Sequence, residues 1–167
     1  MGRVGLALPV GARPTSMHGE GGGSGWIVDG QLEVIERLRV AMNEHDLDAM
    51  VACFDDAYRS EQPAHPNRGF GGAAQVRQNW SALFTAIPEF RADLLRSAIS
   101  GDEAWAEWRW IGTRTGGSRF EERGVSVFGV RGDRIVWARL YLEEVEEGGD
   151  DIDETVRRMA AGPSGAG

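Results

Sequence analysis

The strongest constraint on the fold lies between Phe90 and Glu144, where four apolar runs follow one another with only short gaps. Tryptophan, valine, isoleucine and phenylalanine crowd the runs, whereas glycine, aspartate and serine fill the gaps. This alternation predicts four consecutive strands joined by tight turns, which together form an antiparallel meander. The expected strands are Phe90–Ser100, Trp105–Thr113, Phe120–Arg131 and Arg134–Glu144.

Short helices are expected ahead of the meander, because apolar residues there recur at three- and four-residue spacing. Asp46 is a suitable N-cap for the second of these helices, and Pro88 ends the third. The expected elements are a helix over Gln31–Asn43, a second helix with Leu47, Met50, Val51 and Phe54 on one face, a short strand over Ala57–Gln62, a loop with two prolines over Pro63–Asn67, a third helix over Gly72–Ile87 and a weaker helix over Asp150–Ala161.

This order of elements predicts an α+β fold, in which helices are segregated from an antiparallel sheet. The strands lack a clean alternation of apolar and polar residues: Trp105–Ile111 is apolar on one face and mixed on the other. Both faces of the sheet should therefore be at least partly covered. Since the helices can cover only one face, we expect a homodimer through the outer face.

The composition narrows the possible partners. A formal net charge of −8 disfavours nucleic acid. No apolar run approaches the roughly 20 residues that cross a bilayer, so we expect no membrane partner and a cytoplasmic location. The three histidines and the single Cys53 lack metal-ligand spacing, and we expect no metal and no cofactor. Cys53 itself should be a buried, unreactive thiol on the second helix.

The glycine-rich start and end of the chain contrast with its middle. Residues 1–29 contain the string GEGGGSG and little apolar periodicity, which predicts a disordered leader. Residues 30–147 are expected to form one folded domain. Residues 148–167 should form a short helix followed by a frayed tail.

Five strings of the folded region have a characteristic order and spacing: MNEHDLDAMVACFDDAYRSEQP, GGAAQVRQNWSALFTAIP, WAEWRWIGTRTGG, GVSVFGVRGDRIV and ARLYLEE. With them, the chain from Gln31 to Glu144 resembles the nuclear transport factor 2-like superfamily. SnoaL-like polyketide cyclases and bacterial steroid Δ-isomerases are nearest in pattern. The resemblance implies a cone-shaped, curved antiparallel sheet packed on three N-terminal helices around a pocket. Because this fold hosts both enzymes and carriers, the resemblance is weak evidence for any one function.

The catalytic residues of these relatives are largely missing from the matching positions. Where steroid isomerases have an aspartate base, a protonated aspartate and an oxyanion tyrosine, this chain has Gln62, Ser126 and Leu38. An amide such as Gln62 cannot abstract a proton. The histidine that SnoaL-like cyclases often have on the third strand is replaced by Arg114, and Glu143 is the acid nearest to their aspartate on the last strand.

The same resemblance implies which side chains point into the pocket, because residues two apart on a strand share a face. The pocket is expected to be apolar and aromatic, with a few neutral hydrogen-bonding groups, as is usual for small-molecule sites. The expected ligand-pocket residues are Gln62, Trp108, Trp110, Ser126, Phe128, Leu140 and Leu142, accompanied by Tyr58 and Ser60.

Three residues near the expected mouth of the pocket are candidates for catalysis. His65 lies in the loop after the first strand and titrates near neutral pH, although a solvated loop histidine is the alternative. Tyr58 could orient a ligand carbonyl or simply fill the core, and Glu61 flanks the same place. His45 is expected to be solvated in the turn between two helices.

Three functions remain open at this point. The chain could be a cofactor-free isomerase, cyclase or hydrolase that acts on a neutral hydrophobic ligand and uses His65, Tyr58 or Glu61 for acid–base catalysis. It could instead bind such a ligand without chemistry, which the loss of both pocket aspartates favours. It could also be a dimeric interaction module whose pocket has no ligand.

Overall fold

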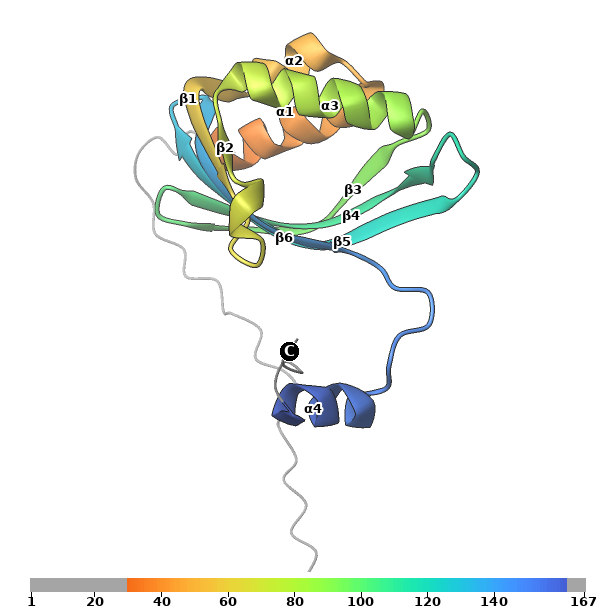
Figure 1. Cartoon of the computed structure of the whole chain (residues 1–167). Coiled ribbons are helices and arrows are strands. Elements are labelled where there is room, and N and C mark those ends of the chain that lie inside the picture. Colours follow the sequence, from red (N-terminus) through yellow and green to blue (C-terminus); the bar gives the residue numbers. More distant parts are fainter. Residues whose placement is uncertain (1–29, 162–167) are drawn as a thin grey trace, which may run out of the picture.

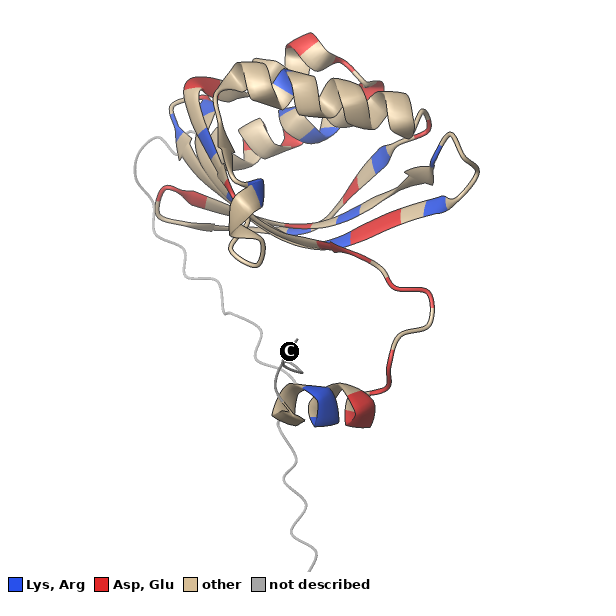
Figure 2. Cartoon of the chain, viewed as in Figure 1, with Lys and Arg blue, Asp and Glu red and all other residues tan. Residues whose placement is uncertain are grey.

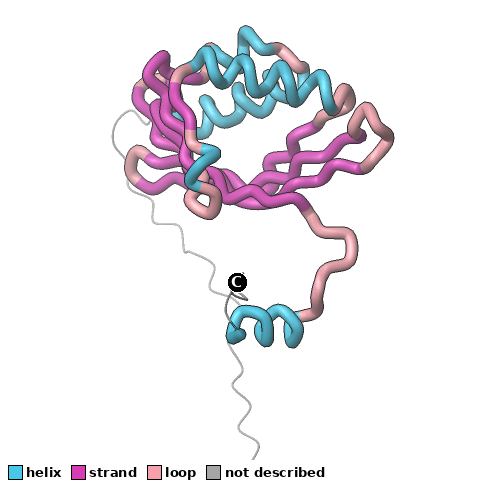
Figure 3. The backbone as a smooth tube through the Cα atoms, viewed as in Figure 1, coloured by secondary structure: helices cyan, strands magenta, loops and turns pink. Residues whose placement is uncertain are grey.

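The computed structural model describes residues 30–161 and confirms the α+β class. Three helices gather on the concave side of a curved, open sheet (Figure 1 and Figure 3). The helices are α1 (Gly30–Glu44), α2 (Leu47–Val51), α3 (Ala73–Ala86) and α4 (Ile152–Ala161), and a 3-10 turn, η1, covers Pro66–Arg68. The strands are β1 (Phe54–Glu61), β2 (Phe70–Gly71), β3 (Arg91–Ser100), β4 (Glu103–Thr113), β5 (Arg119–Arg131) and β6 (Arg134–Glu144).

The four strands of the expected meander form the larger part of the sheet. The strand order is β2-β1-β6-β5-β4-β3, and β3 to β6 pair antiparallel with their neighbours in sequence. Each of the three connecting turns contains a glycine with a positive φ: Gly101 with 63°, Gly117 with 85° and Gly132 with 61°. The meander and its turns are therefore as the sequence predicts.

The sheet departs from a purely antiparallel arrangement at one position. β1 runs parallel to β6, and Ser60 lies opposite Ala138 in this pairing. The pairing also lengthens β1, because Phe54 lies opposite Ile135. The prediction that Phe54 ends the second helix is consequently wrong: α2 stops at Val51, and Cys53 lies in the turn that follows, where it is buried.

The helices pack on the sheet through their predicted apolar faces. α1 buries Ile35, Leu38 and Met42, and α3 buries Val76. The side chain of Asn43 fixes the end of α1 to β3, since its amide donates to the carbonyl oxygen of Ala92 at 3.0 Å and its oxygen accepts from the Ala92 N–H at 2.7 Å.

His45 contradicts the expectation of a solvated turn. Its Nε2 lies 2.9 Å from the carbonyl oxygen of Phe90, and its ring stacks on Phe84 at a centroid distance of 4.3 Å. His45 also has a positive φ of 55°. The residue therefore closes the corner between α1, α3 and β3 rather than facing water.

α4 lies apart from the layered part of the chain and follows an acidic connection after β6 (Figure 2). Its predicted apolar side chains, Ile152, Val156 and Met159, are exposed. No helix within residues 30–161 combines the length and the apolar character that a membrane crossing requires. The leader expected over residues 1–29 lies outside the described residues.

Candidate functional site

A cavity of about 250 Å³ lies between the concave face of the sheet and the helices α1 and α3. Its lining comes from every strand except the edge strand β3 and from two helices, so it exists only in the folded chain. The residues around it are Leu38, Met42, Phe54, Tyr58, Ser60, Gln62, Phe70, Val76, Asn79, Trp80, Leu83, Trp108, Trp110, Ser126, Phe128 and Leu140. All of these side chains are neutral.

Aromatic rings form one wall of the cavity. The Trp80 ring on α3 lies 5.4 Å from the Trp110 ring on β4 and 5.4 Å from the Phe90 ring. Both contacts are edge-on, a geometry that aromatic pairs prefer. This wall joins the third helix to the sheet and so determines the width of the cavity.

Four polar atoms of the lining have no hydrogen-bond partner among the described residues: Ser60 Oγ, Ser126 Oγ, Trp108 Nε1 and Trp110 Nε1. Trp108 and Ser126 are each only 1% exposed. Buried polar groups are nearly always paired, and an unpaired one costs about 1–3 kcal/mol. Two indole donors and two hydroxyl groups thus belong to residues that line the cavity, and they have no partner among the described residues.

The structure brings together most of the residues predicted for the pocket. Gln62, Trp108, Trp110, Ser126, Phe128 and Leu140 line the cavity, as do Tyr58 and Ser60. Leu142 does not line it, but packs against the same core as a partly buried residue. Whether these residues bind a ligand remains a prediction.

Tyr58 is held deep in this core. It is 4% exposed, and its ring packs edge-on to the ring of Phe54 at 4.7 Å. Burial raises the pKa of Tyr58 to about 12, and the nearby Ser60 hydroxyl opposes part of this rise, although the Ser60 Oγ does not reach hydrogen-bonding geometry. Tyr58 therefore stays protonated at neutral pH, so it can donate a hydrogen bond but cannot act as a base.

His65 lies outside the lining of the cavity, in the loop that the sequence predicts. Its Nε2 is 2.8 Å from Oε1 of Glu143, near the end of β6. The loop itself is held by the His65 N–H, which donates to the Gln62 carbonyl oxygen at 2.8 Å. A carboxylate on one ring nitrogen can orient an imidazole, and Glu143 is the acid that the family resemblance singles out.

Glu61 is not placed at the cavity. It alternates with Ser60 and Gln62 along β1 and so points to the opposite face of the sheet. There Arg139 Nε lies 3.0 Å from Glu61 Oε2. Arg139 of β6 thus forms an ion pair with the Glu61 carboxylate on the outer face of the sheet. This geometry gives no support to the expectation that Glu61 carries a proton in the pocket.

Glu122 is a residue of the concave face that the sequence reasoning missed. On β5 it lies directly opposite Trp110 of β4 and Glu144 of β6. Burial raises the pKa of the Glu122 carboxyl above its ordinary value, with Glu144 and Glu143 adding to the rise, while Arg68 and Arg114 oppose it. The strand periodicity could have identified Glu122, because residues two apart on a strand share a face and this spacing leads from Phe128 through Ser126 to Glu122.

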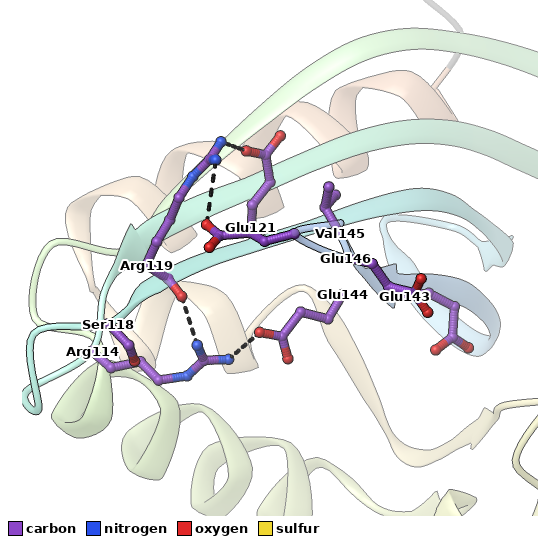
Figure 4. Close-up of a pocket in the computed structure, with 9 residues that line it drawn as sticks. Arg114, Ser118, Arg119, Glu121, Glu143, Glu144, Val145 and Glu146 are labelled. Carbon is purple, nitrogen blue, oxygen red and sulfur yellow. Dashed lines mark hydrogen bonds and ion pairs between the residues drawn. The ribbon is translucent and has the colours of Figure 1, made fainter. Parts of the chain in front are cut away.

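A second, larger hollow of about 550 Å³ lies where the chain leaves β6 (Figure 4). It is lined mainly by charged side chains that already have partners: Arg114 Nη2 lies 2.8 Å from Glu144 Oε1, and Arg119 pairs with Glu121. Its larger volume therefore does not make it the better candidate, because it lacks an apolar wall and most of its charged side chains are already paired. Within residues 30–161, no group of three or more histidine, cysteine or acidic side chains is arranged to hold a metal ion.

Comparison with known proteins gives one family and many structures. A family model described as a SnoaL-like domain matches residues 35–138. No curated protein matches the chain. The match begins within α1 and ends within β6, so it contains every residue that lines the cavity except Leu140.

Solved structures share the fold at low sequence identity. A proposed SnoaL-like polyketide cyclase from Jannaschia sp. CCS1 has 18% identity and a TM-score of 0.61, covering 74% of this chain and 92% of that one. A proposed isomerase from Bacillus subtilis has 20% identity and a TM-score of 0.62, covering 69% and 87%. A Catenulispora acidiphila protein with a ketosteroid isomerase-like fold, in complex with trimethylamine, has 16% identity and a TM-score of 0.58, covering 64% and 82%. At these identities the likeness establishes the fold alone.

Proposed function

This chain belongs to the SnoaL-like domain family, and we propose that it binds a small, neutral, partly apolar molecule in the cavity beneath α3. The observation that carries the proposal is the set of four polar atoms that have no partner among the described residues, in an uncharged and mostly apolar lining. A ligand with a carbonyl or ether oxygen would accept from Trp108 or Trp110, and the two serine hydroxyls can donate or accept.

The neutral lining also limits the charge of the ligand. A carboxylate or phosphate that entered the cavity would lose its hydration without gaining a cation in return. The volume of about 250 Å³ lies just below the range of roughly 300–1,000 Å³ that is typical of sites for drug-sized molecules. We therefore propose a compact ligand of one or two fused rings rather than a long chain.

Intrinsic tryptophan fluorescence tests this proposal, because three of the tryptophans surround the cavity. The chain is titrated with neutral cyclic ketones, epoxides and carboxylates of matched skeleton. Neutral ketones should bind best. Ser126→Ala should lower their affinity by about three- to tenfold, which corresponds to the loss of one hydrogen bond. Trp105→Phe is the control, since Trp105 is 44% exposed and does not line the cavity.

Two results would contradict the proposal. One is preferential binding of the carboxylates, which would mean that a cation outside the neutral lining governs recognition. The other is an unchanged affinity in Ser126→Ala together with a reduced affinity in Trp105→Phe, which would place the ligand on the outer face.

A second candidate function is acid–base catalysis on the bound molecule, and the pair of His65 and Glu143 favours it. His65 would move the proton at the rim, with its ring oriented by the carboxylate, and no cofactor is invoked. If the bound ketones or epoxides are turned over, His65→Gln should lower kcat with little change in KM. Full turnover by this variant would exclude His65 as the proton carrier.

A further inference from the structure

Four glutamates lie on neighbouring parts of β5 and β6: Glu121, Glu122, Glu143 and Glu144. Three of them have side-chain partners. Glu121 pairs with arginines on the outer face, Glu143 with His65, and Glu144 with Arg114. Glu122 differs from the others, since it has no ion pair or hydrogen bond to its carboxylate among residues 30–161.

Glu122 shares the concave face with the cavity wall. Directly opposite residues of an antiparallel pair have Cα atoms roughly 4.5–5.5 Å apart and side chains on the same face. Trp110 is the opposite residue on β4, and its unpaired indole N–H belongs to the cavity lining. Ser126 follows Glu122 by four positions on the same face of β5, and its hydroxyl is also unpaired. Donors thus belong to the cavity lining, and Glu122, which is not itself part of the lining, lies beside Trp110 on the same face of the sheet.

The charges around Glu122 restrict what this acceptor can bind. Glu144 of β6 lies directly opposite Glu122, and Glu143 of β6, Arg68 of η1 and Arg114 of the turn between β4 and β5 are close enough to affect its charge. A ligand carboxylate would be repelled by Glu122 itself and by the two neighbouring acids. A ligand ammonium group would have to give up its hydration beside the uncharged, mostly apolar lining of the cavity. A neutral hydrogen-bond donor avoids both penalties.

We propose that Glu122 accepts a hydrogen bond from a hydroxyl group of the ligand and so selects neutral hydroxy-ketones among the molecules that fit the cavity. The carbonyl oxygen would accept from an indole N–H, and the hydroxyl at the other end would donate to the Glu122 carboxylate. This inference rests on the proposed function, because it assigns the second polar contact of the same ligand. No proton transfer is required.

Three probes of one skeleton test the inference: tetralone, a hydroxytetralone and the methyl ether of that hydroxytetralone. All three are neutral and compact, and they differ only at the position that would reach Glu122. A hydrogen bond to a charged acceptor should favour the hydroxyl compound over its ether by about tenfold or more in fluorescence titrations near neutral pH. Glu122→Gln should reduce this preference to about threefold or less, while the affinity for tetralone stays unchanged.

The control is Glu107→Gln, the same chemical change on the outer face of the neighbouring strand, where Glu107 lies near Arg96. It should leave the hydroxyl preference intact. If Glu122→Gln does not fold, Glu122→Asp retains the charge but shortens the side chain by one methylene, and it should also lose most of the preference.

The pH dependence provides a second measurement. Only the ionised carboxylate is a pure acceptor, so the hydroxyl preference should fall as the pH decreases through the pKa of Glu122. Because burial and the neighbouring acids raise this pKa, the loss should occur above the ordinary value of 4.5. In Glu122→Gln the preference should not depend on pH in this range.

The outcomes separate the two proposals. If tetralone binds but the hydroxyl preference is absent, or if Glu122→Gln leaves it unchanged, the role of Glu122 is overturned and the proposed function stands. If none of the three probes quenches or shifts the tryptophan fluorescence, both proposals fail.

Discussion

At the scale of single residues, Glu121 shows how a buried charge is tolerated in this sheet. The residue is 5% exposed, and its Oε1 lies 2.7 Å from Arg123 Nε and 3.1 Å from Arg109 Nε, while Arg119 pairs with the other oxygen. The carboxylate is covered by guanidinium groups rather than by the apolar core. Its pKa is lowered, first by the hydrogen bond from Arg123 and then by Arg109 and Arg119, against the opposing effect of burial.

This arrangement predicts a specific response to acid. A folded-state pKa below the unfolded value stabilises the fold above the unfolded pKa, and this contribution is lost as the pH falls toward the folded pKa. In urea unfolding, the stability of the wild type should therefore decrease below about pH 4.5 more steeply than that of Glu121→Gln. The variant should also be less stable than the wild type at neutral pH, because three arginines lose their shared partner.

Glu33→Gln is the comparison, since Glu33 is exposed on α1 and takes part in no such cluster. If the stability of the wild type and of Glu121→Gln fell equally with decreasing pH, Glu121 would not be the source of the acid sensitivity.

Gly124 gives a second prediction at this scale. It has a φ of 155°, and a Cβ at this position would lie 2.0 Å from the backbone oxygen of Tyr141. A backbone atom held in the sheet cannot yield easily, so Gly124→Ala should lower the free energy of unfolding by about 2–4 kcal/mol. Gly116→Ala should change it by less than about 0.5 kcal/mol, because nothing lies within 4 Å of a Cβ there. Equal effects of the two substitutions in thermal or urea unfolding would disprove this reading.

At the scale of elements, α3 is the helix that closes the cavity. Val76 is buried, and Trp80, Leu83 and Phe84 pack against the core, while Gly72 precedes the first turn with a φ of 88°. The Trp80 ring lies 5.4 Å from the rings of Phe84, Phe90 and Trp110. One side chain thus connects the helix to two other parts of the fold.

We expect Trp80→Ala to destabilise the chain by about 2–4 kcal/mol, somewhat less than a fully buried tryptophan would, because Trp80 is partly exposed beside the cavity. The same substitution should widen the cavity and weaken any ligand found. Gln78→Ala, on the exposed side of the same helix, is the matched control. A loss below about 1 kcal/mol in chemical denaturation would show that α3 does not depend on this aromatic wall.

At the scale of the whole molecule, the two faces of the sheet differ in how far other elements cover them. Helices pack on the concave face, whereas the outer face exposes Trp105 at 44% and Tyr141 at 45%. On the same face, the Trp137 ring covers Gly129, where a Cβ would lie 2.0 Å from the ring. Large exposed aromatic side chains on a sheet face are typical of interaction surfaces.

We therefore propose the homodimer that the strand pattern predicts, formed through this outer face. Sedimentation at micromolar concentration should give a dimer, and Trp105→Glu should convert it to a monomer with an intact fold. Val40→Glu is the control, since Val40 is an exposed apolar residue on α1 and away from the sheet face. A monomeric wild type would exclude the dimer, and a dimer that survives Trp105→Glu would place the interface elsewhere.

Much of the cavity could be predicted from the sequence because it depends on local periodicity. Two-residue alternation along a strand determines that Trp108 and Trp110 share a face, and three- and four-residue spacing determines which side of α3 contains Val76 and Trp80. These relations hold wherever the elements dock. The meander was predictable for the same reason, since its strands are neighbours in sequence and its turns carry their own signals.

What only the tertiary structure decided involves residues that are distant in sequence. The parallel pairing of β1 with β6 converts Phe54 from a helical to a strand residue and directs Glu61 to Arg139, 78 positions away. Similarly, the pKa of Glu122 is raised first by burial in the folded chain and then by Glu144 of β6, which lies opposite it. A local pattern determines the face that a side chain occupies, but the charges and hydrogen-bonding groups that meet it there depend on which distant segments pair, and that is settled by the packing of the whole chain.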